Sequence, residues 1–406
     1  MTPALAILVL NGGSSSLKFA LFAGDRCTGR GSITGLGHKA SLSARGELFT
    51  DKAFPLPVLG EDCRTTTDAT RILINWMMTF LPRNNLAAVG HRVVHGGDLT
   101  KPMRLTTDLV ERLESLASLA PLHQPFNIES INFIAEIYPD IPQVLCFDTA
   151  FHDTIPLLHR RFALPRHWYD QGVKRYGIHG LSYEYIAGRL SEIAPPAFAG
   201  RTIVAHLGSG ASLCALKNGK SFDTSGGFSE LDGLVMGTRV GTLDAGVILY
   251  FLQKEIFDAS RIASMLYQES GLRGISGISS DMATLLDRPE PTAREAIDLF
   301  CLRITQQAGG LISLLGGIDA LVFTGGIGEH AARIRAQVCK SLEWIDMDLD
   351  AEKNALAKSD QEALLSSPRS KVEIWLIPTD EEAVIARHTR ELLRLPKTFI
   401  AKADLT

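Results

Sequence analysis

The stretch ALAILVLNGGSSSLKFALF at residues 4–22 decides the fold, because RTIVAHLGSGASLCALKNGK at residues 201–220 repeats its pattern. In both stretches an apolar run meets a short turn of Gly and Ser and continues into a second apolar run. The runs at 86–97 (LAAVGHRVVHGG) and 318–330 (IDALVFTGGIGEH) also resemble each other, because each leads into glycines. A supersecondary unit that occurs twice predicts a duplicated fold. Two facing halves with small-residue loops suit a ligand with several phosphates, so we expect a nucleotide cleft.

The composition is that of an ordinary globular protein. Apolar residues make up 45% and charged residues 21% of the 406 positions, and this length predicts two or three domains. The net charge of -4 and the pI near 6.3 give no electrostatic footprint for nucleic acid. The apolar run at 5–10 is too short for a membrane span, and Asp319 and several glycines interrupt the run at 311–327. We therefore expect a cytoplasmic protein that binds neither nucleic acid nor membranes.

The cysteines are not spaced as in metal-binding or redox motifs such as CxxC. Several of them lie in apolar runs, which is typical of small buried side chains in a reducing compartment. The six positions are Cys27, Cys63, Cys146, Cys214, Cys301 and Cys339.

Strand and helix patterns alternate along the chain. Short strands and turns up to about residue 60 predict a β-meander. Pro195 and Pro196 mark a break before the second repeat. Apolar residues at helical spacing predict helices at 65–81, 107–119, 183–193 and 292–315, and apolar runs predict strands at 143–151 and 320–323. This alternation predicts an α/β architecture with mixed sheets.

Three loops follow apolar runs and are rich in Gly or Ser: NGGSSSLK (11–18), HLGSGAS (206–212) and FTGGIGE (323–329). Backbone N–H groups and hydroxyls in such loops hold phosphate oxygens, and a following helix adds its dipole. The alternatives are a plain hairpin turn for the first loop and a tight strand–helix connection for the third. The sequence NGKS (218–221) resembles the tail of a P-loop, but Cys214 stands where the leading Gly belongs. We interpret it as a hairpin turn.

Charged side chains lie beside these loops. Asp148 follows an apolar strand, and Glu381 and Glu382 follow the run IWLIP. Carboxylates at strand ends suit a hydrated Mg²⁺ held against phosphates, whereas a Glu pair that opens a helix is the alternative. Arg92 and Arg239 are each expected in a loop beside glycine, where a solvated surface residue is the alternative.

Histidines are the other candidates for contact with a phosphoryl group. A lone histidine is usually structural. Four histidines in small-residue loops favour the interpretation that one of them contacts the charge that develops on a phosphoryl group during a reaction. These histidines are His95, His123, His179 and His206.

Ten short motifs occur in order along the chain. They are NGGSSSLK from 11, GHRVVHGG from 90, APLHQP from 120, FDTAFH from 147, RYGIHG from 175, HLGSGAS from 206, GTRVG from 237, SGISSD from 276, FTGGIGE from 323 and IPTDEE from 377. With these motifs the chain resembles the acetokinase family from end to end. That family is a branch of the superfamily that also holds sugar kinases, heat-shock chaperone ATPases and actin.

The resemblance implies both fold and activity. The fold would be two duplicated ribonuclease-H-like domains around a nucleotide cleft, with residues 1–148 plus 383–406 in an N-terminal domain and 149–382 in a nucleotide-binding domain. The activity would be reversible transfer of the ATP γ-phosphoryl group to acetate, which gives acetyl phosphate and ADP, with Mg²⁺ or Mn²⁺ as cofactor. The family also implies a homodimer.

The resemblance further implies roles for individual residues. It assigns catalysis to Arg92, Asp148, His179 and Arg239, and the metal site to Asn11 and Glu381. The residues implied at the nucleotide and its phosphates are Asn11, Ser14, Ser16, Lys18, His206, Gly208, Gly210, Asp281, Gly326, Ile327 and Gly328. Those implied at the acid substrate are Arg92, Val94, Leu122, His123 and Ile178.

Several positions depart from the family pattern. Ile178 stands where the family usually has Phe and Glu230 where it has Pro, both beside the expected acyl pocket, so a propionate or butyrate kinase is an alternative. A nucleotide-driven conformational protein and a non-catalytic nucleotide sensor are alternatives from other classes. The departures at Ser209, Ala283, His330 and Asp380 leave the preferred phosphoryl donor open. Leu181 and Tyr183, in the loop expected after His179, also differ from the common pattern.

Overall fold

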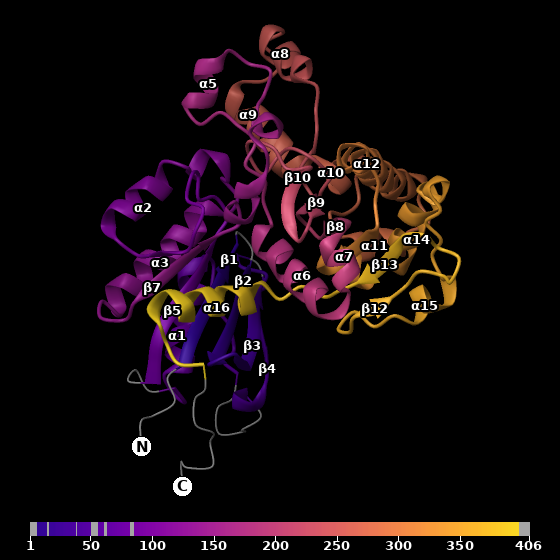
Figure 1. The fold of residues 1–406 in the computed structure, drawn as a ribbon. Helices are drawn as coiled ribbons and strands as arrows, with labels where there is room; N and C mark the ends of the chain where they lie inside the picture. Colours follow the sequence, from indigo (N-terminus) through magenta and orange to yellow (C-terminus); the bar gives the residue numbers. More distant parts are fainter. Residues whose placement is uncertain are drawn as a thin grey trace. The chain divides into compact units, whose positions relative to one another are not determined.

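The structure is a computed structural model that describes residues 6–397, except residues 14–15, 38, 50–55, 61–62 and 82–84. The chain divides into two compact units. Unit 1 consists of Met1–Ala150 and Asp380–Thr406, and unit 2 of Phe151–Thr379. Each unit is built on one β-sheet with helices packed against it (Figure 1).

Unit 1 has a sheet of seven strands. Their order is β4 (Ser41–Arg45), β3 (Arg26–Thr34), β2 (Ser16–Ala23), β1 (Ala6–Gly12), β5 (Leu86–Val93), β7 (Gln143–Phe147) and β6 (Met103–Arg104). All seven residues of β1 are buried, as its apolar sequence dictates, and this strand lies in the middle of the sheet. Strand β1 pairs antiparallel with β2 and parallel with β5. The first four strands form the predicted antiparallel meander.

Helices cover both faces of this sheet. Helix α1 (Thr66–Met77) begins at a capping box formed by Thr65 and Asp68. Its core residues pack with Val89 of β5, whereas a Cβ atom on the next residue, Gly90, would meet α16 (Glu381–Leu393). Because side chains alternate along a strand, α1 and α16 lie on opposite faces. Helix α16 packs against β1, β5 and β7, so the C-terminal helix completes the N-terminal unit. The other helices of unit 1 are α2 (Thr107–Glu114) and α3 (Gln124–Ile137).

Unit 2 repeats the strand order of unit 1. The order is β10 (Lys220–Thr224), β9 (Ala211–Lys217), β8 (Arg201–Leu207), β11 (Ala320–Thr324), β13 (Glu373–Leu376) and β12 (Ala363–Leu364). Strand β8 pairs antiparallel with β9 and parallel with β11, as β1 does with β2 and β5. The central strands β11 and β13 are also parallel, like β5 and β7. The predicted duplicated α/β fold is confirmed.

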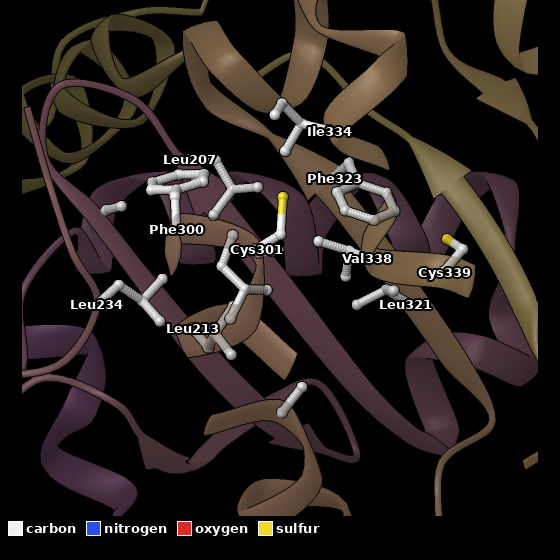
Figure 2. Close-up of a cluster of buried hydrophobic side chains, with 14 of the residues drawn as sticks. Leu207, Leu213, Leu234, Phe300, Cys301, Leu321, Phe323, Ile334, Val338 and Cys339 are labelled. Carbon is white, nitrogen blue, oxygen red and sulfur yellow. The ribbon is translucent and has the colours of Figure 1, made fainter. Parts of the chain in front are cut away.

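The core of unit 2 lies on both faces of its sheet. On one face, side chains of β8, β9 and β11 pack against the long helix α12 (Pro291–Leu315) and α14 (Ala332–Ser341), as Figure 2 shows. On the other face, α6 (Gly180–Ile193) and α7 (Pro195–Ala199) cover the sheet. The remaining helices are α4 (Leu157–Arg160), α5 (Arg166–Asp170), α8 (Ala245–Gln253), α9 (Ala259–Ser264), α10 (Gly271–Ser276), α11 (Met282–Leu286), α13 (Gly325–His330) and α15 (Ala351–Leu356).

The structure corrects four local predictions. Arg92 and His206 lie in strands β5 and β8 and not in loops, because neighbouring strands extend the hydrogen-bonded ladder past them. The third glycine loop is the short helix α13, whose first amide donates to the side chain of Glu329. Pro195 opens helix α7 instead of interrupting the chain, since a first-turn residue needs no N–H donor. The NGKS stretch is the predicted turn, with positive φ at Asn218 and Gly219.

None of the described helices is both long and apolar enough to cross a lipid bilayer. All six cysteines are free thiols, and five of them are buried.

Candidate active site

Unit 1 carries a partly buried arginine–aspartate pair at the ends of two parallel strands. Asp148 follows β7 directly and is fully buried, while Arg92 is the penultimate residue of β5. Arg92 donates to the same carboxylate oxygen, Asp148 Oδ2, from Nε at 3.1 Å and from Nη2 at 2.6 Å. The other oxygen, Oδ1, is buried and has no hydrogen-bond partner among the described residues. A buried oxygen in this state suits a cation.

Asn11 connects this pair to the start of helix α16. Its Oδ1 accepts from Arg92 Nη1 at 3.1 Å, and its Nδ2 donates to Glu381 Oε2 at 3.1 Å and to Glu382 Oε1 at 3.4 Å. Glu381 Oε2 also lies 3.8 Å from Arg92 Nε. The end of β1 therefore brings together one guanidinium and three carboxylates from β5, β7 and α16.

Negative charge is in excess in this cluster. Burial raises the pKa of Asp148, and the Glu381 carboxylate raises it further, against the opposing effect of Arg92. Burial likewise raises the pKa of Glu382, which Lys18 opposes. These carboxylates would bind a cation favourably, because a positive charge offsets both burial and mutual repulsion.

The donor set fits a magnesium ion that keeps much of its water. Among the residues that the structure describes, no group of three His, Cys, Asp or Glu side chains forms a metal cage. Mg²⁺ commonly binds through one or two carboxylates together with water and substrate phosphates. Asp148 Oδ1 and the Glu381 carboxylate meet that need with oxygen atoms alone.

Other predicted residues of unit 1 lie near the same loop. Lys18 on β2 is the cross-strand partner of Asn11, and Ser16 begins β2. His123 precedes α3, and a Cβ atom on Gly13 would lie 3.8 Å from its ring. Val94 is buried just after β5, Leu122 lies in the turn before α3, and Ser14 lies outside the described residues.

Unit 2 carries two stacked histidines. The rings of His179 and His206 are 4.3 Å apart with an interplanar angle of 21°. His179 Nδ1 lies 2.8 Å from Ser212 Oγ, and His206 Nδ1 lies 2.9 Å from Ser182 Oγ. His179 has φ 60° and ψ 23°, a left-handed conformation that is uncommon for a residue other than glycine. Strained backbone of this kind concentrates at functional sites.

Arg239 and His179 converge on the second glycine loop. A Cβ atom on Gly210 would lie 2.6 Å from Arg239 Nη2 and 3.2 Å from His179 Nε2, so a larger residue here would displace the guanidinium. Arg239 is buried, and its Nη1 donates to the backbone oxygen of Glu230 at 2.9 Å and to Glu230 Oε2 at 3.3 Å. The loop backbone therefore lies against one guanidinium and one imidazole.

The glycines of the second and third loops are also close together. A Cβ atom on Gly208 would lie 3.9 Å from the amide nitrogen of Gly326. Gly326, Ile327 and Gly328 all lie in α13, where Ile327 packs against the core. Asp281 caps α11 by accepting from the amide of Thr284, a hydrogen bond that lowers the pKa of its carboxyl.

The sequence marks Tyr183 and Glu230 only as departures from the family pattern, and it does not indicate Arg335 or the contacts that join these residues. Ser212 and Tyr183 contact the histidines, and Glu230 pairs with Arg239. Arg335 on α14 is buried and donates only to neutral oxygens, including the backbone oxygens of Gly328 and Glu329. A serine inside the HLGSGAS loop was a usable signal, but the other contacts join distant parts of the chain.

The fold and these residues define a class of protein. Two sheets of repeated topology, with glycine loops, arginines and carboxylates at strand ends, are typical of the superfamily of sugar kinases, heat-shock chaperone ATPases and actin. Comparison with known proteins narrows the class. The profile of the Acetokinase family matches residues 6–387, so the chain belongs to that family.

Individual relatives agree with this assignment. The chain is 48% identical over 397 residues to an acetate kinase of Rhodopseudomonas palustris, which covers 95% of this chain and 98% of the relative. Among solved structures it resembles the acetate kinase of Porphyromonas gingivalis, with 35% identity and a TM-score of 0.82 over 96% of this chain and 100% of that one. It resembles a propionate kinase of Francisella tularensis equally well, with 35% identity and a TM-score of 0.85 over 95% and 99%.

Proposed function

We propose that this protein transfers the γ-phosphoryl group of ATP to acetate and catalyses the reverse reaction, with acetyl phosphate and ADP as products. It is thus a phosphotransferase with a carboxyl group as acceptor. The observation that carries the proposal is the convergence of Arg239 and His179 on Gly210 in a chain of the Acetokinase family.

The chemistry explains why such a site contains cations and no strong base. Acetate is ionised at neutral pH and is already a nucleophile. The enzyme needs to place it in line with the γ-phosphorus and to neutralise charge that spreads over the phosphoryl oxygens. Arg239 supplies a permanent positive charge at the glycine loop, and His179 supplies a ring nitrogen beside it. Preorganised groups of this kind lower the barrier because they need not reorient during the reaction.

Unit 1 supplies the groups that hold the metal. Asp148 Oδ1 and Glu381 are the proposed ligands of Mg²⁺ or Mn²⁺, and such an ion neutralises phosphate charge when it is bound. Both polar atoms of the Asn11 side chain already contact neighbours, so Asn11 holds Glu381 and Arg92 in place. Arg92 orients Asp148 and contributes charge toward the carboxylate substrate.

A hydroxamate assay tests the proposal directly. Purified protein with Mg²⁺, ATP and hydroxylamine is incubated with acetate, propionate, butyrate or no acid, and the acyl hydroxamate is measured. We expect a strong signal with acetate. A larger signal with propionate or butyrate would assign the chain to the alternative acids, with buried Ile178 as the first residue to examine. ATP hydrolysis without hydroxamate would contradict phosphoryl transfer to a carboxylate.

An exposed apolar helix supports a homodimer. Helix α8 has the sequence AGVILYFLQ and no buried residue. Leu249 and Tyr250 are each more than half exposed, which is unusual for an apolar helix of a monomer. We propose that a second copy of the chain covers this helix. Sedimentation of the wild type is expected to give a dimer, and Leu249→Glu a monomer; a monomeric wild type would contradict the proposal.

The free cysteines support a cytoplasmic location. Reduced, buried thiols are typical of a reducing compartment. A fluorescent fusion is expected to fill the cytoplasm, and a peripheral signal would contradict the proposal.

A further inference from the structure

A buried pair of hydroxyls stands behind His179. Tyr183 on α6 is fully buried, and its OH lies 2.5 Å from Ser212 Oγ on β9. Ser212 Oγ in turn lies 2.8 Å from His179 Nδ1. The three groups form a continuous chain of hydrogen bonds, all inside unit 2. Ser212 can serve both neighbours, because a hydroxyl donates once and accepts twice.

The position of the His179 ring is fixed by other contacts. The ring stacks on His206, which Ser182 holds at Nδ1. The backbone of His179 is left-handed, directly before the first turn of α6. These contacts determine where the ring lies. These contacts do not determine which ring nitrogen of neutral His179 carries the proton. The hydrogen bonds through Ser212 and Tyr183 determine the position of that proton.

The acidity of the two hydroxyls determines which group donates in each of these hydrogen bonds. A phenol is more acidic than an aliphatic alcohol and is the better donor of the two, so Tyr183 donates to Ser212 Oγ. The Ser212 hydroxyl then donates to His179 Nδ1, which accepts through its lone pair. The proton of the neutral ring consequently resides on Nε2, the nitrogen that faces Gly210 beside Arg239.

We propose that Tyr183 is a positioning residue for phosphoryl transfer: through Ser212 it fixes His179 as the Nε2–H tautomer, a neutral donor to a phosphoryl oxygen. The inference rests on the proposed function for the role of His179, but the tautomer is a property of the free protein. Without the tyrosine hydroxyl, Ser212 can reverse and accept from Nδ1–H. The lone pair of Nε2 would then face the phosphoryl oxygens and repel them.

The test combines a tautomer measurement with kinetics. His179 is assigned in ¹⁵N-histidine NMR spectra of the full chain at pH 8.5, two units above the ordinary histidine pKa of about 6.5. We expect the wild type to show the protonated nitrogen at Nε2. In Tyr183→Phe we expect a substantial population with the proton at Nδ1. The same variant should lose about tenfold in kcat, with the KM for ATP and for acetate within twofold of wild type, because binding groups stay in place.

Matched variants separate this role from a structural one. Tyr185→Phe removes a hydroxyl two residues along the same helix from a half-buried side chain, and it should change neither spectrum nor kcat. Ser212→Ala breaks the chain one step nearer the ring and should match Tyr183→Phe. The kcat of the double variant should be no lower than that of either single variant, because both substitutions break the same hydrogen-bonded link between Tyr183 and His179. Ser212→Ala carries the same test if Tyr183→Phe does not fold.

Two results would overturn the inference. One is a wild-type spectrum with the proton on Nδ1. The other is an unchanged tautomer and a kcat within twofold of wild type in Tyr183→Phe or, should that variant not fold, in Ser212→Ala. A wild type that forms no acyl hydroxamate would contradict the proposed function, while the spectra would still decide how the hydroxyl chain sets the tautomer.

Discussion

The two units share a scaffold and differ in the chemistry that it carries. In unit 1, the side chain of Asn11 at the end of β1 lies among the carboxylates of Asp148, Glu381 and Glu382 and the guanidinium of Arg92. In unit 2, β8 and β9 enclose the loop of Gly210, and the groups against it are Arg239 and the stacked histidines. One topology thus supports a site with an excess of carboxylates in one unit and, in the other, a site where Arg239 supplies the positive charge and pairs with Glu230.

This contrast shows which parts of a duplicated fold carry its function. Strands β1 and β9 in the interior of the two sheets are buried and mostly apolar, and such strands specify pairing and order. The residues that would meet the substrates lie at strand ends, in connecting loops or at helix starts, where a side chain can change without disturbing the sheet. Four predictions test the contrast between the two sites.

The largest effect is expected from the partly buried ion pair of unit 1. Asp148→Asn leaves the Arg92 guanidinium without its closest carboxylate, and removal of one partner from a buried pair costs about 3 kcal/mol of unfolding free energy. Urea denaturation measures it. Glu230→Gln in unit 2 should cost less, because its contact with Arg239 is longer, at 3.3 Å. The exposed Glu47→Gln is the control and should leave stability unchanged. An equal loss in the first two variants would contradict the contrast between the pairs.

The arginines should give the largest kinetic effect. Arg92→Ala and Arg239→Ala should each lower kcat in the hydroxamate assay by roughly a hundredfold, as expected when a charge-stabilising group is lost. The contrast between units predicts a further difference. Raising the Mg²⁺ concentration should partly restore the kcat of Arg92→Ala, because Arg92 orients the proposed metal ligand Asp148. It should not restore the kcat of Arg239→Ala. Turnover near that of the wild type in either variant would contradict the assigned roles.

Acid should affect the two units alike, because each contains a buried histidine whose pKa is lowered. Burial lowers the pKa of His91 in unit 1 and of His152 in unit 2 to about 4. The unfolded value is about 6.5, so the unfolded chain binds protons more readily. Each histidine therefore contributes stability above pH 6.5, and this contribution decreases as the pH falls toward 4, by about 2 kcal/mol at pH 5. Unfolding between pH 7.5 and 5 measures it.

Single substitutions serve as the check on this pH dependence. His91→Gln and His152→Gln should each remove about 2 kcal/mol of the decrease in unfolding free energy between pH 7.5 and 5. A slope identical to that of the wild type would show that the substituted histidine is not the group that titrates.

The smallest effect is expected from one methyl group in the site of unit 2. Gly210→Ala places a Cβ atom 2.6 Å from Arg239 Nη2 and should lower kcat about tenfold by displacing that side chain. Gly309→Ala is a matched control within α12, because nothing lies within 4 Å of its added Cβ, and it should keep full activity. Equal activity in the two variants would contradict the close approach of the loop to Arg239.

Much of the scaffold could be predicted from the sequence. The paired apolar runs around residues 11–18 and 206–212 predicted both hairpins, and helical spacing predicted α12 to within one residue. Local patterns suffice there because pairing of consecutive strands and helix periodicity are short-range properties. They failed for Arg92 and His206, since the length of a strand depends on the neighbours that pair with it.

The arrangement of the candidate site was less accessible. Residue types in loops indicated Asp148, His179 and Arg239 as candidates. No local pattern shows that Glu230 pairs with Arg239, or that Tyr183 reaches Ser212 across 29 positions of the chain. Such contacts depend on which buried polar groups the finished fold brings within reach of one another. They are the features for which coordinates are necessary.

The packing of the C-terminal helix α16 on unit 1 has a consequence for folding during synthesis on the ribosome. The first residues to be synthesised belong to a unit that stays incomplete until almost the whole chain has been made, because α16 covers β1, β5 and β7. Translation of unit 2 begins after that of unit 1, yet all of unit 2 has been synthesised before the last segment of unit 1 is made. Domains usually mature in the order of translation, and here that order is reversed. A nascent chain that stalls before Glu381 therefore lacks two of the three carboxylates around Asn11, including the proposed metal ligand Glu381.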